Sequence, residues 1–384
     1  MDIIPISADD HIWEHPTTWT SRVEARFRDR CPQLRDIDGV DWWVYNGEPV
    51  RKVGTGAAAL IEGRGEVTRY FDAPEAAYVP AARLAAMDED GVGAQVLFPQ
   101  AAGFGGGPFV STEGDPDLRL ACIRAYNDWL AEEWSDVSPR FVAQCLAPMW
   151  DVDLAIAEVR RAYELGHRAL VWTAAPQMYG FPHFNETYWD GLWSTLQELD
   201  LPCCLHIGSA KATHVVWDGF SPMRRLSTSS TMIITSNVNV VANLLFSGVL
   251  DRFPELKFVS VESGLGWVPY LLETADHQYE AQHLWDDGMT MRPSEYFRRN
   301  CYVNFWFEAS GIALRHMIGI DNIMWEADFP HPTSTYPHSR KAIESSLAEV
   351  PVAEQQKMLE TNAARLFRID VASLDLPESC TYVA

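Results

Sequence analysis

The chain alternates along its whole length between short apolar runs and amphipathic stretches with helical spacing. The runs are rich in Val, Ile, Phe and Leu with little polar alternation, which is typical of parallel strands covered by helices. The predicted strands are residues 3–8, 94–98, 142–146, 169–172, 203–206, 258–262, 302–305 and 323–328. The predicted helices include residues 151–165, 189–199, 239–250 and 339–347. Eight strands that alternate with helices predict an α/β fold, a (β/α)8 TIM barrel.

Composition and charge restrict the partners of such a chain. Its 384 residues carry a formal net charge of −23, which argues against nucleic acid and against anionic membrane surfaces, because few basic groups are available to neutralise phosphates. No apolar run approaches the roughly 18 residues needed to span a bilayer, and the start lacks the pattern of a secretory signal. Seven cysteines without a CxxC pair favour free thiols. We therefore expect a cytoplasmic protein with no nucleic-acid or membrane partner.

Three segments are too long to be simple connections. Residues 32–78, with a Trp-Trp-Val-Tyr run and several glycines, are predicted to form a small N-terminal hairpin insertion. Residues 211–236 and 264–300 are predicted to be long, lid-like βα loops. The glycine run at 103–107 lacks the GxGxxG spacing of a phosphate loop and is interpreted as a flexible turn. We expect residues 1–384 to form a single barrel domain.

Titratable side chains lie at the ends of four predicted strands, and in a parallel barrel these ends meet at one face. Asp9 and His11 share one face of the first strand, whereas Asp10 points away; Glu326 and Asp328 share a face at the last. Any one of them alone is readily explained as a salt-bridged strand end. Several buried carboxylates together repel one another, and a divalent cation is the natural way to hold them. The candidate metal ligands are Asp9, His11, His206, Glu262, Glu326 and Asp328.

Two residues near these ligands are candidates for catalysis. His331 lies just beyond the eighth strand and would ligate a second ion or act as an acid–base group; an exposed loop histidine is the alternative. Glu14 follows His11 by three residues and would bridge or orient a ligand, or equally cap the next segment. Aromatic residues near strand ends, such as Trp13 and Trp306, suggest a bulky hydrophobic substrate.

With these motifs the chain resembles the amidohydrolase-related family that includes the aminocarboxymuconate-semialdehyde and resorcylate decarboxylases. That family's HxH or ExH run on the first strand is similar to residues 9–11 (Asp-Asp-His), its fifth-strand histidine to His206, and its eighth-strand aspartate to Asp328. Residues 253–257 and 362–367 are further similar fragments. The resemblance covers nearly the whole chain. It implies an amidohydrolase-type barrel in which Asp328 is a general base or proton shuttle, and a homo-oligomer by analogy.

The ligand set nevertheless departs from the family pattern. The family's histidine after the sixth strand is Glu262 here, the first ligand is Asp9 rather than histidine, and Glu326 replaces a small residue. No lysine ends the fourth strand, which argues against a carboxylated-lysine bridge between two ions. Mixed carboxylate and imidazole donors suit iron or manganese better than zinc. Their number would hold two ions, as in carboxylate-rich di-iron centres, and the chain in this respect resembles TIM-barrel non-heme di-iron monooxygenases.

Two classes of function follow from this ligand set. The first, favoured by Glu262 and Glu326, is a monooxygenase with two iron ions that hydroxylates a bulky hydrophobic acid or its thioester, with an electron donor that the sequence does not name. The second, favoured by the family resemblance, is a decarboxylase or hydrolase with one Mn²⁺ or Zn²⁺ ion. A third interpretation is a barrel that has lost its catalytic activity, but the convergence of candidate ligands argues against it. We predict the first class, the di-iron monooxygenase.

Overall fold

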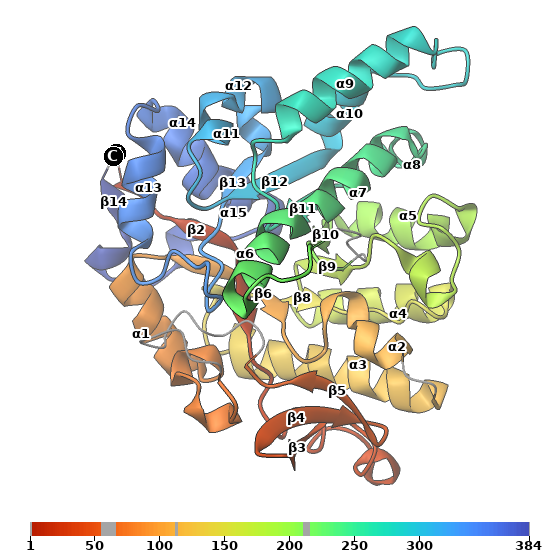
Figure 1. Ribbon diagram of the computed structural model, residues 1–384, viewed down its shortest axis with the longest axis vertical. Helices are drawn as coiled ribbons and strands as arrows, with labels where there is room; N and C mark the ends of the chain where they lie inside the picture. Colours follow the sequence, from red (N-terminus) through yellow and green to blue (C-terminus); the bar gives the residue numbers. More distant parts are fainter. Residues whose placement is uncertain (1, 55–66, 112–113, 210–215, 384) are drawn as a thin grey trace.

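Parallel strands surrounded by helices form the body of the molecule (Figure 1). The computed structural model describes residues 2–54, 67–111, 114–209 and 216–383. Its parallel strands form one sheet in the order β2-β6-β7 and another in the order β8-β9-β10-β11-β12-β13. The barrel strands are β2 (Ile6–Ile12), β6 (Ala94–Pro99), β7 (Phe141–Val142), β8 (Gln144–Cys145), β9 (Ala169–Trp172), β10 (Cys203–His206), β11 (Phe258–Val261), β12 (Cys301–Phe305) and β13 (Ile323–Trp325). The predicted (β/α)8 barrel is confirmed.

The two sheets close into one barrel at two places. The third predicted strand is divided into β7 and β8, which pair with the neighbours on either side. On the opposite side, β2 is joined to the segment after β13 by backbone hydrogen bonds. The amide of His11 donates to the carbonyl of Phe329 (2.6 Å), and the amide of Asp328 donates to the carbonyl of Asp9 (3.0 Å). The first and last strands are therefore held together where their polar residues lie.

The helices follow from local sequence signals. In α4 (Val152–Glu164), the Asp151 side chain accepts a hydrogen bond from the amide of Leu154 (3.0 Å) and caps the helix start, and Gly166 follows the helix end with a φ of 100°. None of the described helices is long and apolar enough to cross a membrane. The helices of more than one turn are α1 (Pro80–Asp90), α2 (Gly107–Ser111), α3 (Pro116–Leu130), α4, α5 (Asp190–Leu199), α6 (Pro222–Ile233), α7 (Thr235–Phe246), α9 (Val268–Ala281), α10 (Pro293–Asn300), α13 (Ser339–Leu347), α14 (Val352–Gln356) and α15 (Asn362–Phe367). The short helices are α8 (Val249–Arg252), α11 (Ser310–Ala313) and α12 (Arg315–Ile318).

Several predicted boundaries differ from the structure. The first strand was expected at residues 3–8 but runs over 6–12, because its acidic and histidine residues are buried inside the strand rather than beyond its end. The helix expected at 239–250 begins earlier, at Thr235, and breaks before α8. Residues 264–300, predicted to be a long lid-like loop, contain α9 and α10.

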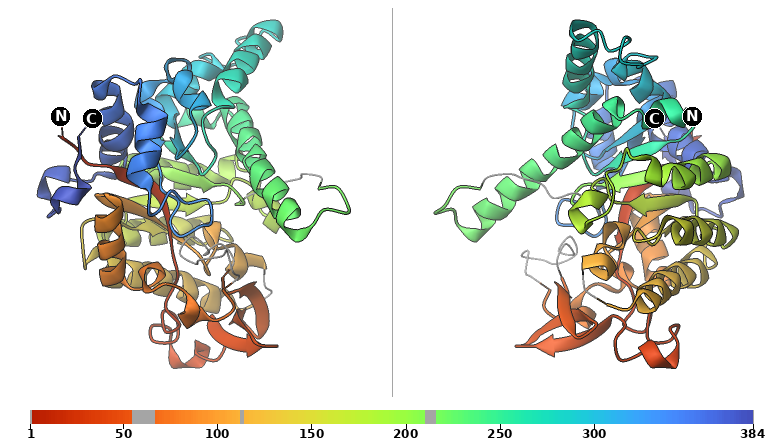
Figure 2. Two further views of the ribbon diagram at one scale, coloured as in Figure 1. Left: turned by 60° about the vertical axis from the view of Figure 1, so that its left-hand side comes forward. Right: turned by 90° about the vertical axis from the view of Figure 1, so that its right-hand side faces the viewer.

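The N-terminal insertion is an antiparallel sheet of three strands, β3 (Gln33–Ile37), β4 (Val40–Tyr45) and β5 (Glu48–Lys52). It stands out from the barrel, as does α6 (Figure 2). Residues 55–66 of the predicted insertion and 211–215 of the predicted loop lie outside the described residues. At the other side of the molecule, β1 (Asp2–Ile3) pairs with β14 (Tyr382–Val383), so the two described chain ends are side by side.

Candidate metal centre

Four side chains from three barrel strands bring their ligand atoms together at the carboxyl-terminal face. The Nε2 atom of His206, at the end of β10, lies 3.3 Å from Asp9 Oδ2, 3.2 Å from Glu262 Oε2 and 3.3 Å from His11 Nε2. Asp9 and His11 come from β2, and Glu262 directly follows β11. One ligand atom from each of these four residues lies within 4.8 Å of the others. We call this group the four-ligand cluster.

A second group overlaps the first and contains the eighth-strand residues. His11, Glu262, Asp328 and His331 also have ligand atoms within 4.8 Å of one another. Asp328 Oδ1 lies 3.6 Å from His11 Nε2 and 2.5 Å from His331 Nδ1, and Asp328 Oδ2 accepts a hydrogen bond from Thr333 (2.8 Å). The structure thus places Asp328 and His331 as a hydrogen-bonded pair beside the four-ligand cluster.

The tautomer of His206 follows from its hydrogen bonds. Its Nδ1 atom lies 2.7 Å from the carbonyl oxygen of Ile207, which can only accept, so Nδ1 carries the proton. In the neutral ring Nε2 then holds the free lone pair, and this atom faces Asp9 and Glu262. A histidine fixed in this way is arranged as a metal ligand.

The site contains buried carboxyl groups whose charge is not balanced by hydrogen bonds. Asp9 is fully buried, and neither of its carboxylate oxygens has a hydrogen-bond partner among the described residues. Burial, with the charges of Asp328 and Glu262, raises the pKa of Asp9 well above its usual range, and burial raises the pKa of Glu262 to about 7 and that of Asp328 to about 8. Burial lowers the pKa of both imidazoles, His11 and His206. A divalent cation would relieve the repulsion and use the orphaned oxygens, so the residues fit a metal ion.

Two of the acidic residues stand on strained backbone. Glu262 has a φ of 55° and Asp328 a φ of 58°, in the left-handed region that costs an ordinary residue about 1 kcal/mol or more. Both directly follow or lie just beyond a barrel strand, where the chain turns out of the sheet. Strain of this kind clusters at functional sites. It aims both carboxylates at the same point in the barrel mouth.

Glu326 lies next to these residues without joining either group. Its side chain is fully buried, Oε2 is 3.4 Å from the amide of Glu262, and Oε1 has no partner among the described residues. Burial, together with the negative charge of Asp9, raises the pKa of Glu326 well above its usual range. The structure therefore places five of the six predicted metal ligands in the two groups and the sixth beside them.

Glu14 occupies a different position from the one its predicted catalytic role requires. Its buried carboxylate accepts hydrogen bonds from the amides of Ala101 (2.7 Å to Oε2) and Ala102 (2.9 Å to Oε1). It belongs to neither group of ligand atoms. Glu14 therefore lies beside the loop after β6, where its hydrogen bonds stabilise the backbone of that loop.

One arginine of the insertion influences the site, although its sequence pattern does not predict this. Burial lowers the pKa of His11 and His331, and the positive charge of Arg51, on β5, lowers the pKa of both imidazoles further. Its Nε atom is buried and has no hydrogen-bond partner in the described part of the chain. Nothing in the spacing of residues 32–78 marks this arginine, because its position depends on how the inserted sheet packs over the barrel mouth.

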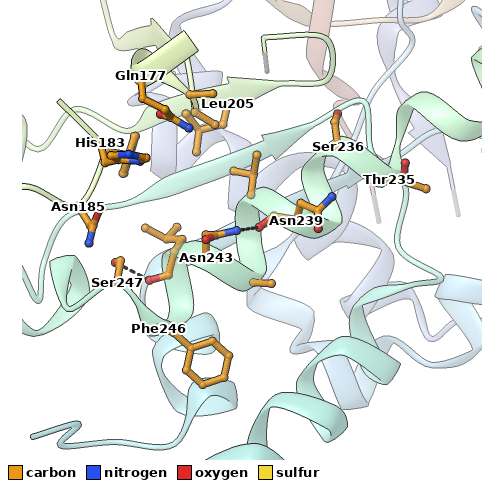
Figure 3. Close-up of a pocket in the computed structure, with 16 residues that line it drawn as sticks. Gln177, His183, Asn185, Leu205, Thr235, Ser236, Asn239, Asn243, Phe246 and Ser247 are labelled. Carbon is orange, nitrogen blue, oxygen red and sulfur yellow. Dashed lines mark hydrogen bonds between the residues drawn. The ribbon is translucent and has the colours of Figure 1, made fainter. Parts of the chain in front are cut away.

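A separate cavity of about 490 Å³ lies between α7 and the segment that follows β9 (Figure 3). Gln177, His183, Asn239 and Asn243 are among the residues that line it. Leu205 also lines this cavity, whereas its neighbour His206 belongs to the four-ligand cluster. Successive strand residues point to opposite faces, so this cavity is distinct from the candidate metal centre.

Comparison with known proteins places the chain in a family. The family model described as Amidohydrolase matches residues 12–369, and the chain belongs to this family. It is 28% identical over 308 residues to the gamma-resorcylate decarboxylase of Polaromonas sp., a match that covers 75% of this chain and 87% of the relative. It is 26% identical over 310 residues to that of a Rhizobium species, covering 76% and 87%.

Solved structures share the fold. An amidohydrolase from Mycobacterium avium subsp. paratuberculosis superposes with a TM-score of 0.74 at 21% identity, covering 96% of this chain and 100% of that one. The 5-carboxyvanillate decarboxylase of Novosphingobium aromaticivorans, solved with bound manganese, gives a TM-score of 0.65 at 17% identity, covering 95% and 96%. These matches confirm the amidohydrolase-type barrel.

The predicted function is corrected by the same comparisons. The curated relatives are decarboxylases, which cleave a carbon–carbon bond without oxygen, so the expected monooxygenase is wrong. Manganese is the metal named for solved decarboxylases of this fold, and nothing supports the expected pair of iron ions.

Proposed function

We propose that the protein is a decarboxylase of small aromatic carboxylic acids that uses one divalent metal ion, with Mn²⁺ favoured. The observation that carries the proposal is the four-ligand cluster, in which neither carboxylate oxygen of the buried Asp9 has a hydrogen-bond partner among the described residues, in a chain related to gamma-resorcylate decarboxylases. Mixed oxygen and imidazole donors suit manganese better than zinc. The substrate class follows from the relatives, which are named for hydroxylated benzoates.

The residues that would hold the ion are Asp9, His11, His206 and Glu262. When bound, the ion neutralises the carboxylates and polarises an oxygen of the substrate. The protein supplies fixed geometry around it: His206 keeps Nε2 free because Nδ1 donates to a carbonyl, and the strained backbone of Glu262 directs its carboxylate inward. Glu326 lies outside this ligand set in the proposal.

The Asp328–His331 pair would move the proton that decarboxylation requires. When the bond between the ring carbon and the carboxylate breaks, CO₂ leaves and the electron pair remains on the carbon, which must accept a proton. Asp328 Oδ1 can carry this proton, and His331 Nδ1, 2.5 Å away, can return it. His331 is partly exposed whereas Asp328 is buried, so the pair connects the site to solvent.

Arg51 would bind the anionic part of the substrate. Its charge adds to burial in lowering the pKa of His11 and His331, and its Nε atom has no hydrogen-bond partner among the described residues. A charge-assisted hydrogen bond of this kind contributes about 1.5–3 kcal/mol. We expect Arg51→Met to raise KM about 10- to 100-fold with a smaller effect on kcat.

The matched control for this variant is Arg35→Met, because Arg35 lies on β3 of the same insertion and is exposed. Steady-state kinetics of both variants give the measurement. Equal KM values for Arg51→Met and the wild-type protein would remove Arg51 from the proposal.

The test of the function itself is CO₂ release from 2,6-dihydroxybenzoate and 5-carboxyvanillate by metal-free protein reconstituted with Mn²⁺. We expect metal-dependent release that is the same with and without dioxygen, and about one manganese per chain by elemental analysis.

Two variants test the roles of single residues. His206→Ala should lose metal and activity. Asp328→Asn should keep metal and lose at least about 100-fold in kcat. Activity that required dioxygen, or full activity without metal, would overturn the proposal.

A further inference from the structure

The glycine run that follows β6 crosses the barrel mouth instead of forming a phosphate loop. Gly103, Gly105 and Gly106 have φ values of 67°, 64° and 70°, which ordinary residues rarely adopt. A Cβ atom on Gly105 would lie 2.9 Å from the amide nitrogen of Thr173, just beyond β9. The loop from the second barrel strand is therefore pressed against the end of the fourth, and only glycine fits the contact.

This path brings one aromatic ring over the candidate ligand on the fifth barrel strand. The ring of Phe104 stacks on the imidazole of His206, with 3.9 Å between ring centroids and 15° between the ring planes. Phe98, on β6, contacts the same imidazole at 5.1 Å with the planes at 60°. Phe104 also meets His11 edge-on at 5.9 Å. The imidazole of His206 is thus held by an aromatic face as well as by its hydrogen bond to Ile207.

We propose that Phe104 is a positioning residue that fixes the ring plane of His206 for metal binding, and that the glycine run serves to deliver it. The inference rests on the proposed metal site. The Nδ1 hydrogen bond fixes one atom of the imidazole but leaves the ring free to tilt about it. Stacking against Phe104 limits this tilt, and it keeps Nε2 directed at Asp9 and Glu262. A preorganised ligand binds metal more tightly because less freedom is lost on binding.

The experiment is a Mn²⁺ titration of the metal-free full chain, in which electron paramagnetic resonance measures the free ion. We expect Phe104→Leu to weaken Mn²⁺ binding roughly tenfold, since the side chain stays apolar while the stacked ring is lost. Phe104→Tyr keeps the ring and should restore the wild-type Kd. This rescue separates ring stacking from the mere presence of a residue at this place.

Two control variants keep the inference falsifiable. Phe109→Leu removes a buried ring of α2 that contacts Tyr45 and Trp19 but not the cluster, and should leave the Kd unchanged. Gly105→Ala should weaken binding like Phe104→Leu, whereas Gly180→Ala, with a φ of 84° and no atom within 4 Å of the added carbon, should not.

Each outcome decides between the two proposals. Wild-type Kd in Phe104→Leu, with the wild-type protein binding Mn²⁺, overturns the positioning role and leaves the proposed function standing. A wild-type protein that binds no Mn²⁺ overturns both. Equal weakening in Phe104→Leu and Phe109→Leu would show a general packing effect and also overturn the positioning role.

Discussion

At the scale of single residues, Glu14 separates a structural carboxylate from a catalytic one. Both of its oxygens accept backbone hydrogen bonds, from Ala101 and Ala102. We expect Glu14→Gln to lower the free energy of unfolding by about 1–3 kcal/mol, because one buried amide then faces an NH₂ group. The kcat at saturating Mn²⁺ should change little. Urea denaturation and steady-state kinetics measure the two effects, and a kcat loss of about 100-fold with unchanged stability would instead assign Glu14 to proton transfer.

Residues at strand ends could be predicted from the sequence, and residues that arrive from loops could not. His206 and Asp328 were found because parallel strands end at one face of a barrel, whatever the loops do. Arg51 and Phe104 reach the site from an insertion and from a glycine-rich loop, and their direction depends on packing that no periodicity records. Glu14 has the same sequence signal as a ligand, since a carboxylate near His11 accepts amide protons as readily as it binds a metal ion.

At the scale of elements, the hydroxyl of Ser7 joins the first barrel strand to the segment that carries Glu326 and Asp328. Ser7 Oγ accepts a hydrogen bond from the amide of Ala327 (2.7 Å) and donates to the carbonyl of Asp9 (3.1 Å). Ser7→Ala leaves a buried amide unsatisfied and should lower the free energy of unfolding by about 1–3 kcal/mol. Because Ser7 also holds the carbonyl of Asp9, a proposed metal ligand, Mn²⁺ affinity should fall as well.

Ser346→Ala is the control, because Ser346 is buried with an Oγ that has no hydrogen-bond partner in the described residues. Chemical denaturation and the Mn²⁺ titration measure stability and affinity in both variants. If Ser7→Ala lowers the free energy of unfolding without changing the Mn²⁺ affinity, the hydrogen bonds of Ser7 stabilise the barrel but do not position the metal ligands.

Elements with a local start and stop signal could be predicted closely, whereas those defined by their neighbours could not. The helix predicted at residues 151–165 is observed at Val152–Glu164, with Asp151 as its cap and Gly166 after its end. The first strand was predicted to end at residue 8 rather than 12, because Asp9, Asp10 and His11 looked like a polar strand end. They are buried inside the strand because the rest of the site surrounds them. The bounds of β2 thus depend on tertiary context that a single segment does not contain.

At the scale of the whole molecule, the buried carboxylates link metal binding to folding. Without metal, burial raises the pKa of Glu262 to about 7 and that of Asp328 to about 8, from ordinary values near 4.5 and 3.8. The folded chain then binds more protons than the unfolded chain across this range, so the stability of the metal-free protein falls as the pH rises. Mn²⁺ should remove most of this loss. We expect the gap in Tm between Mn²⁺-loaded and metal-free protein to widen from about pH 6 to about pH 8.

Calorimetry over this pH range gives the measurement, with Mg²⁺ at equal concentration as a control for general cation effects. A Tm gap that narrows as the pH rises would contradict the link between the carboxylates and the metal.

The class of fold could be predicted at this scale but the class of reaction could not. Strand and helix alternation determines a barrel, and the amidohydrolase resemblance was correct. Oxygenase and decarboxylase chemistry can share the fold and much of the donor set, and they differ in metal identity and substrate, which a ligand list does not determine. Glu262 and Glu326 favoured the wrong class, because carboxylate-rich donors are compatible with either one.

The left-handed backbone at Glu262 and Asp328 has a consequence for the evolution of this protein. Glycine or asparagine would occupy either position with less strain and would also remove a buried charge. Selection for thermal stability alone would therefore enrich substitutions of Glu262 and Asp328, and the selected variants would be stable but inactive. A mutant library designed to raise the thermal stability of this protein should keep both positions constant. The backbone strain at these positions is retained because function requires their carboxylates.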